Sequence, residues 1–299
     1  DIASLKGIEH MPNLAVLDVS YNKIPDALAV EGYGKLTRLD CDHNPLTSLS
    51  VKGCKALREL KANDCFYQDE YGKAIYTLAA IDLTGCGALE TLNIEDNSIA
   101  VLDLHDCVSL REIRCAYNDL TTIDFSSCTK MTAITCRNNP LHGLTLDVSM
   151  CPDLLYLACW EAGLAGVDVS GCPKLQELLV YYNDLNSIDI SACPALTRVD
   201  LHGTKISALD LGNCSKLSWI DLEFNTIDRL DFSACTELRE VSLGYNELAE
   251  LDLSMCPLLE ELSVSDNKLT SLNVRGCTQL KSLSAARNSL PEIDLSSCS

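Results

Sequence analysis

The side chains with the greatest capacity for chemistry in this sequence are cysteines, and one of them stands beside a tryptophan and a glutamate. Residues 154–163 read LLYLACWEAG, which makes Cys159, Trp160 and Glu161 neighbours. This trio has three interpretations: a reactive thiol with helper groups, a metal site, or side chains that alternate between the two faces of a strand. The chain holds 17 cysteines and 2 tryptophans. The elements that position these residues therefore decide between the interpretations.

A second chemical candidate is His202, which lies near Asp200, Asp221 and Glu223 in the sequence. One histidine among carboxylates lacks a defined nucleophile or metal. No G-x-S-x-G, H-E-x-x-H or C-x-x-C motif is present, so hydrolases, zinc peptidases and dithiol enzymes have no support. We expect no catalytic residues, no metal and no cofactor, and predict a protein that is not an enzyme.

Composition narrows the range of partners. The 299 residues are 47% hydrophobic, and 43 acidic against 23 basic residues give a net charge of −20. An acidic surface repels phosphate backbones, so we expect no nucleic acid partner. No segment approaches the roughly 20 apolar residues of a membrane-spanning helix, so we expect no direct membrane insertion. The chain begins DIASLKG and shows no secretion signal.

A repeat of 21 residues organises nearly the whole chain. LREIRCAYNDLTTIDFSSCTK (110–130) and LREVSLGYNELAELDLSMCPL (238–258) share the frame LxxLxLxxNxLxxLDLSxCxx. Thirteen units begin between Leu14 and Leu280, with steps of 22, 21, 32, 21, 21 and 23 residues and then 21 six times. Apolar residues alternate within LxxLxL, as a half-buried strand requires. Units this small share one core by stacking on their neighbours.

This frame resembles the leucine-rich repeat proteins, in particular short-repeat bacterial forms with surface or secreted members. The resemblance implies a curved right-handed superhelix with a parallel concave β-sheet of about 13 strands and extended or 3₁₀ convex segments. We expect one solenoid over 1–299: residues 1–13 are the tail of a preceding unit or an edge, and thirteen repeats fill 14–299. The resemblance to leucine-rich repeat proteins also implies a secreted or cell-surface bacterial protein, with a cytoplasmic protein as the alternative. No polar cap follows the last repeat, so we expect a longer protein or an end that packs on a partner.

The frame accounts for every cysteine. Twelve occupy the convex position of LDLSxC, four replace the third core residue of a strand (Cys41, Cys115, Cys136 and Cys159), and Cys65 replaces the repeat asparagine. Stacked equivalents have parallel Cα–Cβ directions, which is poor disulfide geometry. We therefore predict a ladder of buried, inert thiols. A second column, the LDLS aspartates from Asp82 to Asp294, caps local turns or, alternatively, binds cations.

The longest unit contains an insertion after its strand, FYQDEYGKAIY (66–76). We expect it to project from the rim of the solenoid. It carries four aromatic residues, Phe66, Tyr67, Tyr71 and Tyr76. They form either a binding loop or a small satellite core, and the sequence leaves both open.

Aromatic residues concentrate on the strand face, meaning the side of the sheet that points away from the core and is concave in this fold. We predict ligand-binding residues there, mainly in the units from 154 to 237. They are Tyr117, Tyr156, Trp160, Tyr181, Tyr182, Asp200, His202, Trp219, Asp221, Glu223, Phe224 and Tyr245. An exposed aromatic cluster with a polar rim is typical of a binding site.

The ligand expected for this face is a protein or peptide, and the carboxylates favour basic or hydrogen-bond-donating groups on it. Two alternatives remain: a carbohydrate-binding surface protein, and a structural spacer in a larger surface protein. For the segment LLYLACWEAG the repeat frame therefore predicts a strand. Leu157 and Cys159 point toward the core, and Tyr156, Ala158 and Trp160 lie on the strand face.

Overall fold

The computed structural model describes residues 2–298, which divide into two compact units, up to His142 and from Gly143 onward. In both units each repeat contributes a strand of three residues at its third to fifth positions. Identical positions pair across neighbouring strands, as Glu112 pairs with Ala133. The one helical element in residues 2–298 is a 3₁₀ turn, η1 (Ile8–His10). No helix in this part of the chain is long and apolar enough to span a membrane.

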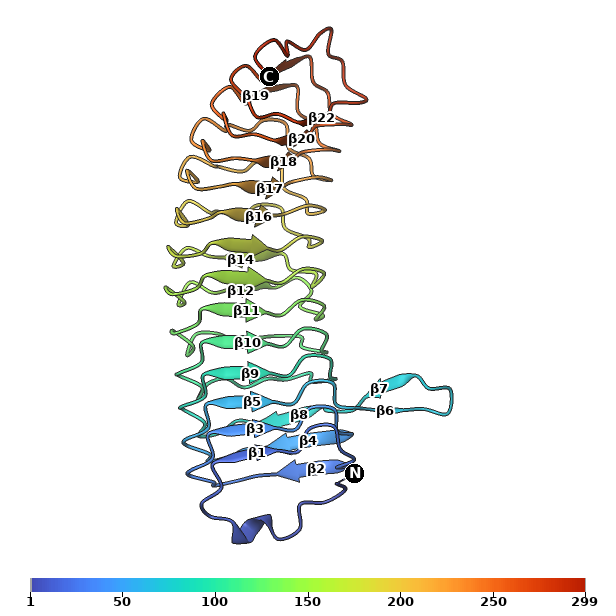
Figure 1. Cartoon of the computed structure of the whole chain (residues 1–299), viewed down its shortest axis with the longest axis vertical. Helices are drawn as coiled ribbons and strands as arrows, with labels where there is room; N and C mark the ends of the chain where they lie inside the picture. Colours follow the sequence, from blue (N-terminus) through green and yellow to red (C-terminus); the bar gives the residue numbers. More distant parts are fainter. Residues whose placement is uncertain (1, 299) are drawn as a thin grey trace. The chain divides into compact units, whose positions relative to one another are not determined.

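The first unit contains six parallel strands of the main sheet, shown in blue to green in Figure 1. In spatial order they are β1 (Val16–Asp18), β3 (Arg38–Asp40), β5 (Glu59–Lys61), β9 (Thr91–Asn93), β10 (Glu112–Arg114) and β11 (Ala133–Thr135). A smaller sheet on the other side of the coils contains β2 (Asp26–Ala29), β4 (Leu46–Ser50) and β8 (Ala80–Asp82). The inserted segment forms β6 (Phe66–Gln68) and β7 (Ala74–Tyr76).

The second unit continues the pattern with seven parallel main-sheet strands. They are β13 (Tyr156–Ala158), β15 (Glu177–Leu179), β16 (Arg198–Asp200), β17 (Trp219–Asp221), β18 (Glu240–Ser242), β20 (Glu261–Ser263) and β22 (Ser282–Ser284). Two short parallel pairs complete it: β12 (Thr145–Asp147) with β14 (Gly166–Asp168), and β19 (Glu250–Asp252) with β21 (Ser271–Asn273). The predicted leucine-rich-repeat solenoid with thirteen parallel strands is confirmed, and so are its extended convex segments. The single-domain boundaries at 1–299 stay a prediction.

The core is a stack of leucine layers closed by cysteine. In a typical repeat, Leu175, Leu178 and Cys193 are all fully buried. All seventeen cysteines are thiols, and sixteen of them are buried. Several ladder thiols donate to a carbonyl 24 residues back, as the Cys54 Sγ does to the Val30 oxygen at 3.0 Å. Burial raises the pKa of the Cys107 thiol to about 12, which keeps it protonated and unreactive. The structure therefore supports cysteine as core packing.

The repeat asparagines join adjacent coils, because each side chain bonds backbone groups that the turn leaves unpaired. The Asn118 Nδ2 donates to the carbonyls of Ile94, Cys115 and Ala116, at 2.8, 3.2 and 3.3 Å. Its Oδ1 accepts the Ile99 N–H at 3.0 Å. Cys65, in the same frame position, directs its thiol to the Ala62 carbonyl at 3.4 Å. This cysteine therefore reproduces one of the asparagine's donor bonds.

The LDLS aspartates form Asx turns in both units. In each, the carboxylate accepts the backbone N–H two residues later, as Asp168 does from Ser170 at 2.9 Å. Ten aspartates share this bond: Asp82, Asp103, Asp124, Asp147, Asp168, Asp189, Asp210, Asp231, Asp252 and Asp294. The hydrogen bonds from Ser170 hold the pKa of the Asp168 carboxyl below its usual range. The column has the geometry expected of turn caps.

Candidate functional site

Three aromatic rings of the second unit form a continuous stack on the strand face. Trp160, Tyr181 and His202 occupy the seventh position of consecutive repeats. Ring centroids are 4.9 Å apart for Trp160 and Tyr181 and 4.5 Å for Tyr181 and His202, with 14° between planes in each pair. Strands in register repeat every 4.7–4.9 Å or so, which matches the spacing of offset-stacked rings. The parallel register therefore turns an aromatic column of the sequence into a stack.

The eighth position of each repeat adds a second aromatic row, formed by Tyr182, Phe224 and Tyr245. These side chains are 51%, 50% and 45% exposed. The Phe224 and Tyr245 rings stack at 4.3 Å and 10°. Between the first two of them lies Gly203, where an added Cβ would come 2.5 Å from the Tyr182 Cδ1. Because of this glycine, the Tyr182 ring can lie across the neighbouring repeat and meet the His202 ring edge-on at 4.5 Å.

The backbone of this second row is left-handed throughout. Tyr182, Phe224 and Tyr245 have φ of 50°, 56° and 56°. Side chains with a Cβ enter this region at a cost of about 1–2 kcal/mol per residue. Partial burial offsets that cost, and about half of each ring stays exposed. The eighth position therefore holds these aromatic rings at the surface, with a left-handed backbone like that of the same position in other repeats.

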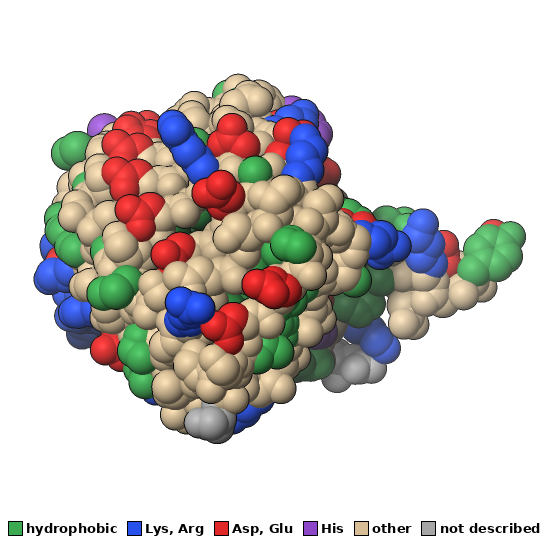
Figure 2. Space-filling model, turned by 90° about the horizontal axis from the view of Figure 1, so that it is seen from above, with side chains coloured by type: hydrophobic (Ala, Val, Ile, Leu, Met, Phe, Trp, Pro, Cys, Tyr) green, Lys and Arg blue, Asp and Glu red, His purple; other side chains and the backbone are tan. Residues whose placement is uncertain are grey.

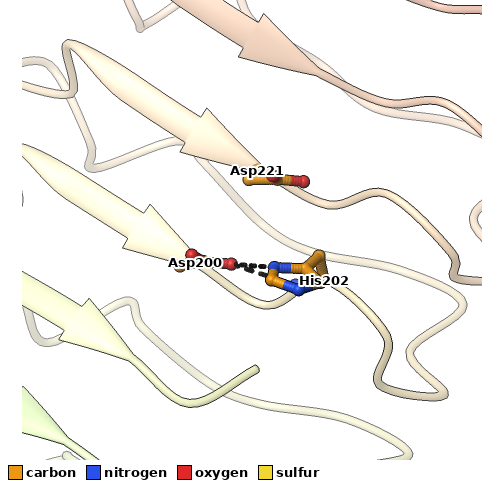
Figure 3. A group of neighbouring side chains, drawn as sticks. All are labelled: Asp200, His202 and Asp221. Carbon is orange, nitrogen blue, oxygen red and sulfur yellow. Dashed lines mark hydrogen bonds and ion pairs between the residues drawn. The ribbon is translucent and has the colours of Figure 1, made fainter. Parts of the chain in front are cut away.

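Carboxylates flank the aromatic rows. Asp200 is 7% exposed, and its Oδ1 bonds the His202 Nδ1 at 2.7 Å. Asp200 and Asp221 are direct partners across β16 and β17. Burial and then the Asp200 charge raise the pKa of the Asp221 carboxyl to about 6. Glu223, beside them, accepts the Ser263 hydroxyl at 3.1 Å. Figure 3 shows Asp200 and His202 turned toward one another, with Asp221 beside them.

The other three predicted strand-face residues lie apart from these rows and carboxylates. Tyr156 is half-buried in β13. Trp219 is in β17, and the Arg198 guanidinium covers its ring at 4.1 Å from the centroid. Tyr117 belongs to the first unit, where Arg137 lies 5.0 Å from its ring centroid. The structure therefore brings together nine of the twelve predicted strand-face residues, around His202 and along the row that ends at Tyr245. Trp219 instead forms a cation–π contact with Arg198 of the same chain.

The rim insertion contributes to a small satellite cluster, and its role as a binding loop stays a prediction. Phe66 packs edge-on against Tyr76 at 5.9 Å and against His43 at 6.3 Å, which makes a small satellite cluster. Tyr67 and Tyr71 are 51% and 87% exposed. The antiparallel hairpin of β6 and β7 extends away from its own unit in Figure 1, and Figure 2 shows hydrophobic side chains at the end of this projection.

A groove beside the hairpin was not predicted. It has a volume of about 680 Å³ and is lined by Tyr21, His43, Phe66 and Tyr67 among others. The Tyr21 and His43 rings stack at 4.1 Å on neighbouring eighth positions. The sequence holds a signal for it, because both residues stand in the column that carries Tyr182. Only two neighbouring repeats have aromatic residues at the eighth position here, so this position in the sequence does not distinguish the groove from aromatic residues scattered along the chain.

The fold, the asparagine bonds and the buried thiols together define a leucine-rich-repeat solenoid with a cysteine ladder. No protein-family model and no curated protein sequence matches the chain. Among solved structures, it is similar to the functional domain of InlJ from Listeria monocytogenes, which includes a cysteine ladder: identity is 27% and the TM-score 0.74, over 96% of this chain. The match covers 66% of that chain, so the present chain spans just under two thirds of its length.

Two further solved structures share the fold at lower identity. YopM, a leucine-rich effector protein from Yersinia pestis, matches with 22% identity and a TM-score of 0.64, over 94% of this chain and 80% of its own. The plant peptide hormone receptor RGFR1, solved in complex with RGF2, matches with 17% identity and a TM-score of 0.56, over 95% and 53%. The fold is therefore one that also serves in a peptide receptor.

Proposed function

We propose that this chain is a non-enzymatic recognition module that binds a protein or peptide with basic groups through the strand face of its second unit. The observation that carries the proposal is the pair of aromatic rows beside three carboxylates. Trp and Tyr bury a large area with few rotatable bonds, which is why they dominate binding hot spots. Asp200, Asp221 and Glu223 supply negative charge beside the rings, and the chain as a whole has a net charge of −20.

The geometry of the stack favours a peptide over a carbohydrate. A sugar packs on the flat face of an aromatic ring. Trp160 and His202 cover the two faces of the Tyr181 ring, and Arg198 covers one face of Trp219. The ring edges and hydroxyl groups that remain exposed suit hydrogen bonds and side-chain contacts with a polypeptide. The proposed setting is a secreted or cell-surface bacterial protein, on the resemblance of its short repeats to such proteins.

The direct test is selection from a library of random peptides displayed on phage, with the purified chain as bait. We expect the selected peptides to be enriched in Lys and Arg. A synthetic copy of one of them should bind Trp160→Ala about 30-fold more weakly than wild type, since loss of a hot-spot side chain costs about 2 kcal/mol.

The matched control for this experiment is Tyr71→Ala, which removes an exposed aromatic residue of the rim hairpin and should leave affinity unchanged. Equal affinity of wild type and Trp160→Ala would place the ligand elsewhere. Selective retention of glycans on an array, with no peptide selected, would favour the carbohydrate alternative.

A further inference from the structure

The strand face of the second unit brings three metal-ligating side chains to one point. Asp200 ends β16, Asp221 ends β17 directly beside it, and His202 follows two residues after Asp200. One ligand atom from each side chain lies within 4.8 Å of the other two. In a zinc site each ligand atom is about 2.0–2.2 Å from the metal, so ligand atoms lie at most about 4 Å apart. A small rotation of one carboxylate closes that difference.

The histidine ring is held in the orientation such a site needs. Its plane stacks on Tyr181, and the Tyr182 ring meets it edge-on. These two contacts direct Nδ1 toward the Asp200 carboxylate, at 2.7 Å, as Figure 3 shows. Neighbouring rings thus preorganise the nitrogen ligand, and metal binding loses less side-chain freedom.

The local charge balance also favours a cation. Within residues 2–298, neither Asp200 nor Asp221 forms an ion pair with a lysine or arginine, and Arg198 lies on Trp219 instead. Glu223 adds a third carboxylate two residues after Asp221. A half-buried group of like charges is stabilised when a divalent ion enters it.

The donor set selects the kind of ion. Calcium takes about 6–8 oxygen ligands, and magnesium prefers a regular shell of oxygen and water. One imidazole nitrogen with two carboxylates suits a borderline ion such as zinc, which binds three protein groups and leaves a further position open. We infer that Asp200, His202 and Asp221 form a binding site for a divalent transition-metal ion of the zinc class, with an open position on the strand face.

The Asp200 carboxylate accepts a hydrogen bond from the His202 Nδ1–H at 2.7 Å, so binding through Nδ1 requires the neutral ring to shift this proton to Nε2 and to exchange the bond to Asp200 for a bond to the metal. The open position is available to water or to a donor group of a bound partner. The site lies inside the proposed binding surface, but metal uptake is measured on the chain alone. The inference therefore does not rest on the proposed function.

The experiment titrates Co²⁺ and Zn²⁺ into metal-stripped protein, with visible absorption for cobalt and calorimetry for zinc. We expect one ion per chain and cobalt absorption that differs from that of the hydrated ion. His202→Ala and the isosteric Asp221→Asn should each weaken zinc binding by about 100-fold or more, since loss of an outer-shell partner alone costs about 10–100-fold. Far-UV circular dichroism shows whether each variant keeps the fold.

The matched control is His43→Ala. This histidine also neighbours a carboxylate, with its Nε2 3.7 Å from an Asp64 oxygen, but it lacks the third ligand. Its loss should leave the stoichiometry and affinity at wild-type values. The inference is overturned if wild-type protein leaves cobalt in its hydrated form, or if folded Asp221→Asn binds zinc as tightly as wild type. Peptide affinity measured in a chelator tests the proposed function separately.

Discussion

Gly203 determines where the Tyr182 ring lies, and Gly203→Ala tests the geometry of the aromatic rows. An alanine Cβ at this position would come 2.5 and 2.7 Å from two ring carbons of Tyr182. Carbon atoms pack best at about 3.5–4.0 Å, so the ring has to move by about 1 Å or more. The backbone at φ 62° tolerates alanine at some cost, because every other repeat has a residue with a Cβ at φ between 50° and 56° there.

The expected loss of stability has two parts. The backbone contributes about 0.5–1 kcal/mol, since left-handed strain is partly offset by the smaller entropy of the unfolded alanine chain. Loss of the edge-on contact between Tyr182 and His202 contributes about 0.5–1.5 kcal/mol. Gly203→Ala should therefore lower the free energy of unfolding by about 2 kcal/mol, measured by urea denaturation followed by circular dichroism.

A double-mutant cycle separates the two parts. In a Tyr182→Ala background the ring is absent, so Gly203→Ala should cost only the backbone part, and the coupling should be about 1 kcal/mol. Gly143→Ala is the matched control, because its φ is 74° and an added Cβ would meet nothing within 4 Å. A coupling near zero, or equal losses at Gly203 and Gly143, would refute the placement of the Tyr182 ring.

Three further predictions concern the scaffold. Asn118→Ala should cost about 3 kcal/mol in urea denaturation, because it leaves buried backbone groups unbonded at about 1–3 kcal/mol each; a loss below 1 kcal/mol or so contradicts the asparagine's role. Burial raises the pKa of the Asp42 carboxyl from 3.8 to about 7, so folding opposes its ionisation and stability is lost as the pH rises from 4 to 7. Asp42→Asn should stabilise the protein at pH 8 by about 1–2 kcal/mol, after a discount for solvent screening, and should have no effect near pH 3; equal effects at both pH values contradict this. A thiol-specific reagent should rapidly label at most one cysteine of native protein, Cys298, which is the one partly exposed; fast labelling of several would contradict the buried ladder.

The sequence predicts the fold well because the same physical constraint occurs thirteen times. An unusual residue at one position of one repeat obscures little of the pattern, because the same position in the other twelve repeats still identifies the face that is buried in the core. Cys65 and Ala162 show this, since each departs from the repeat asparagine without obscuring the frame. The N–H group of Ala162 bonds the Asn183 Oδ1 at 3.2 Å, so the next repeat still satisfies the backbone there.

The side-chain contacts of the site could be predicted only in part. Register is a property of the repeat, so Asp200 had to lie beside Asp221 once the strands were aligned. Rotamers are not periodic. Arg198 could have turned toward Glu177, its partner across β15 and β16, but instead it covers Trp219, its partner across β16 and β17. Tyr182 crosses to the next repeat only because a glycine is there. These choices depend on local packing, which a column of residue types does not specify.

The left-handed eighth position bears on the proposal that the aromatic rows meet a ligand. Asp64, Asp96, Asn138 and Asp266 occupy this position in other repeats. Asn and Asp tolerate the left-handed region better than bulky residues do, so the fold itself has no need of an aromatic ring there. Yet Phe224 and Tyr245 stand at consecutive eighth positions, half exposed, in the repeat that holds Asp221 and Glu223 and in the one after it. The proposal of a ligand on this face rests on the exposed half of each ring, since the backbone conformation alone does not require an aromatic side chain.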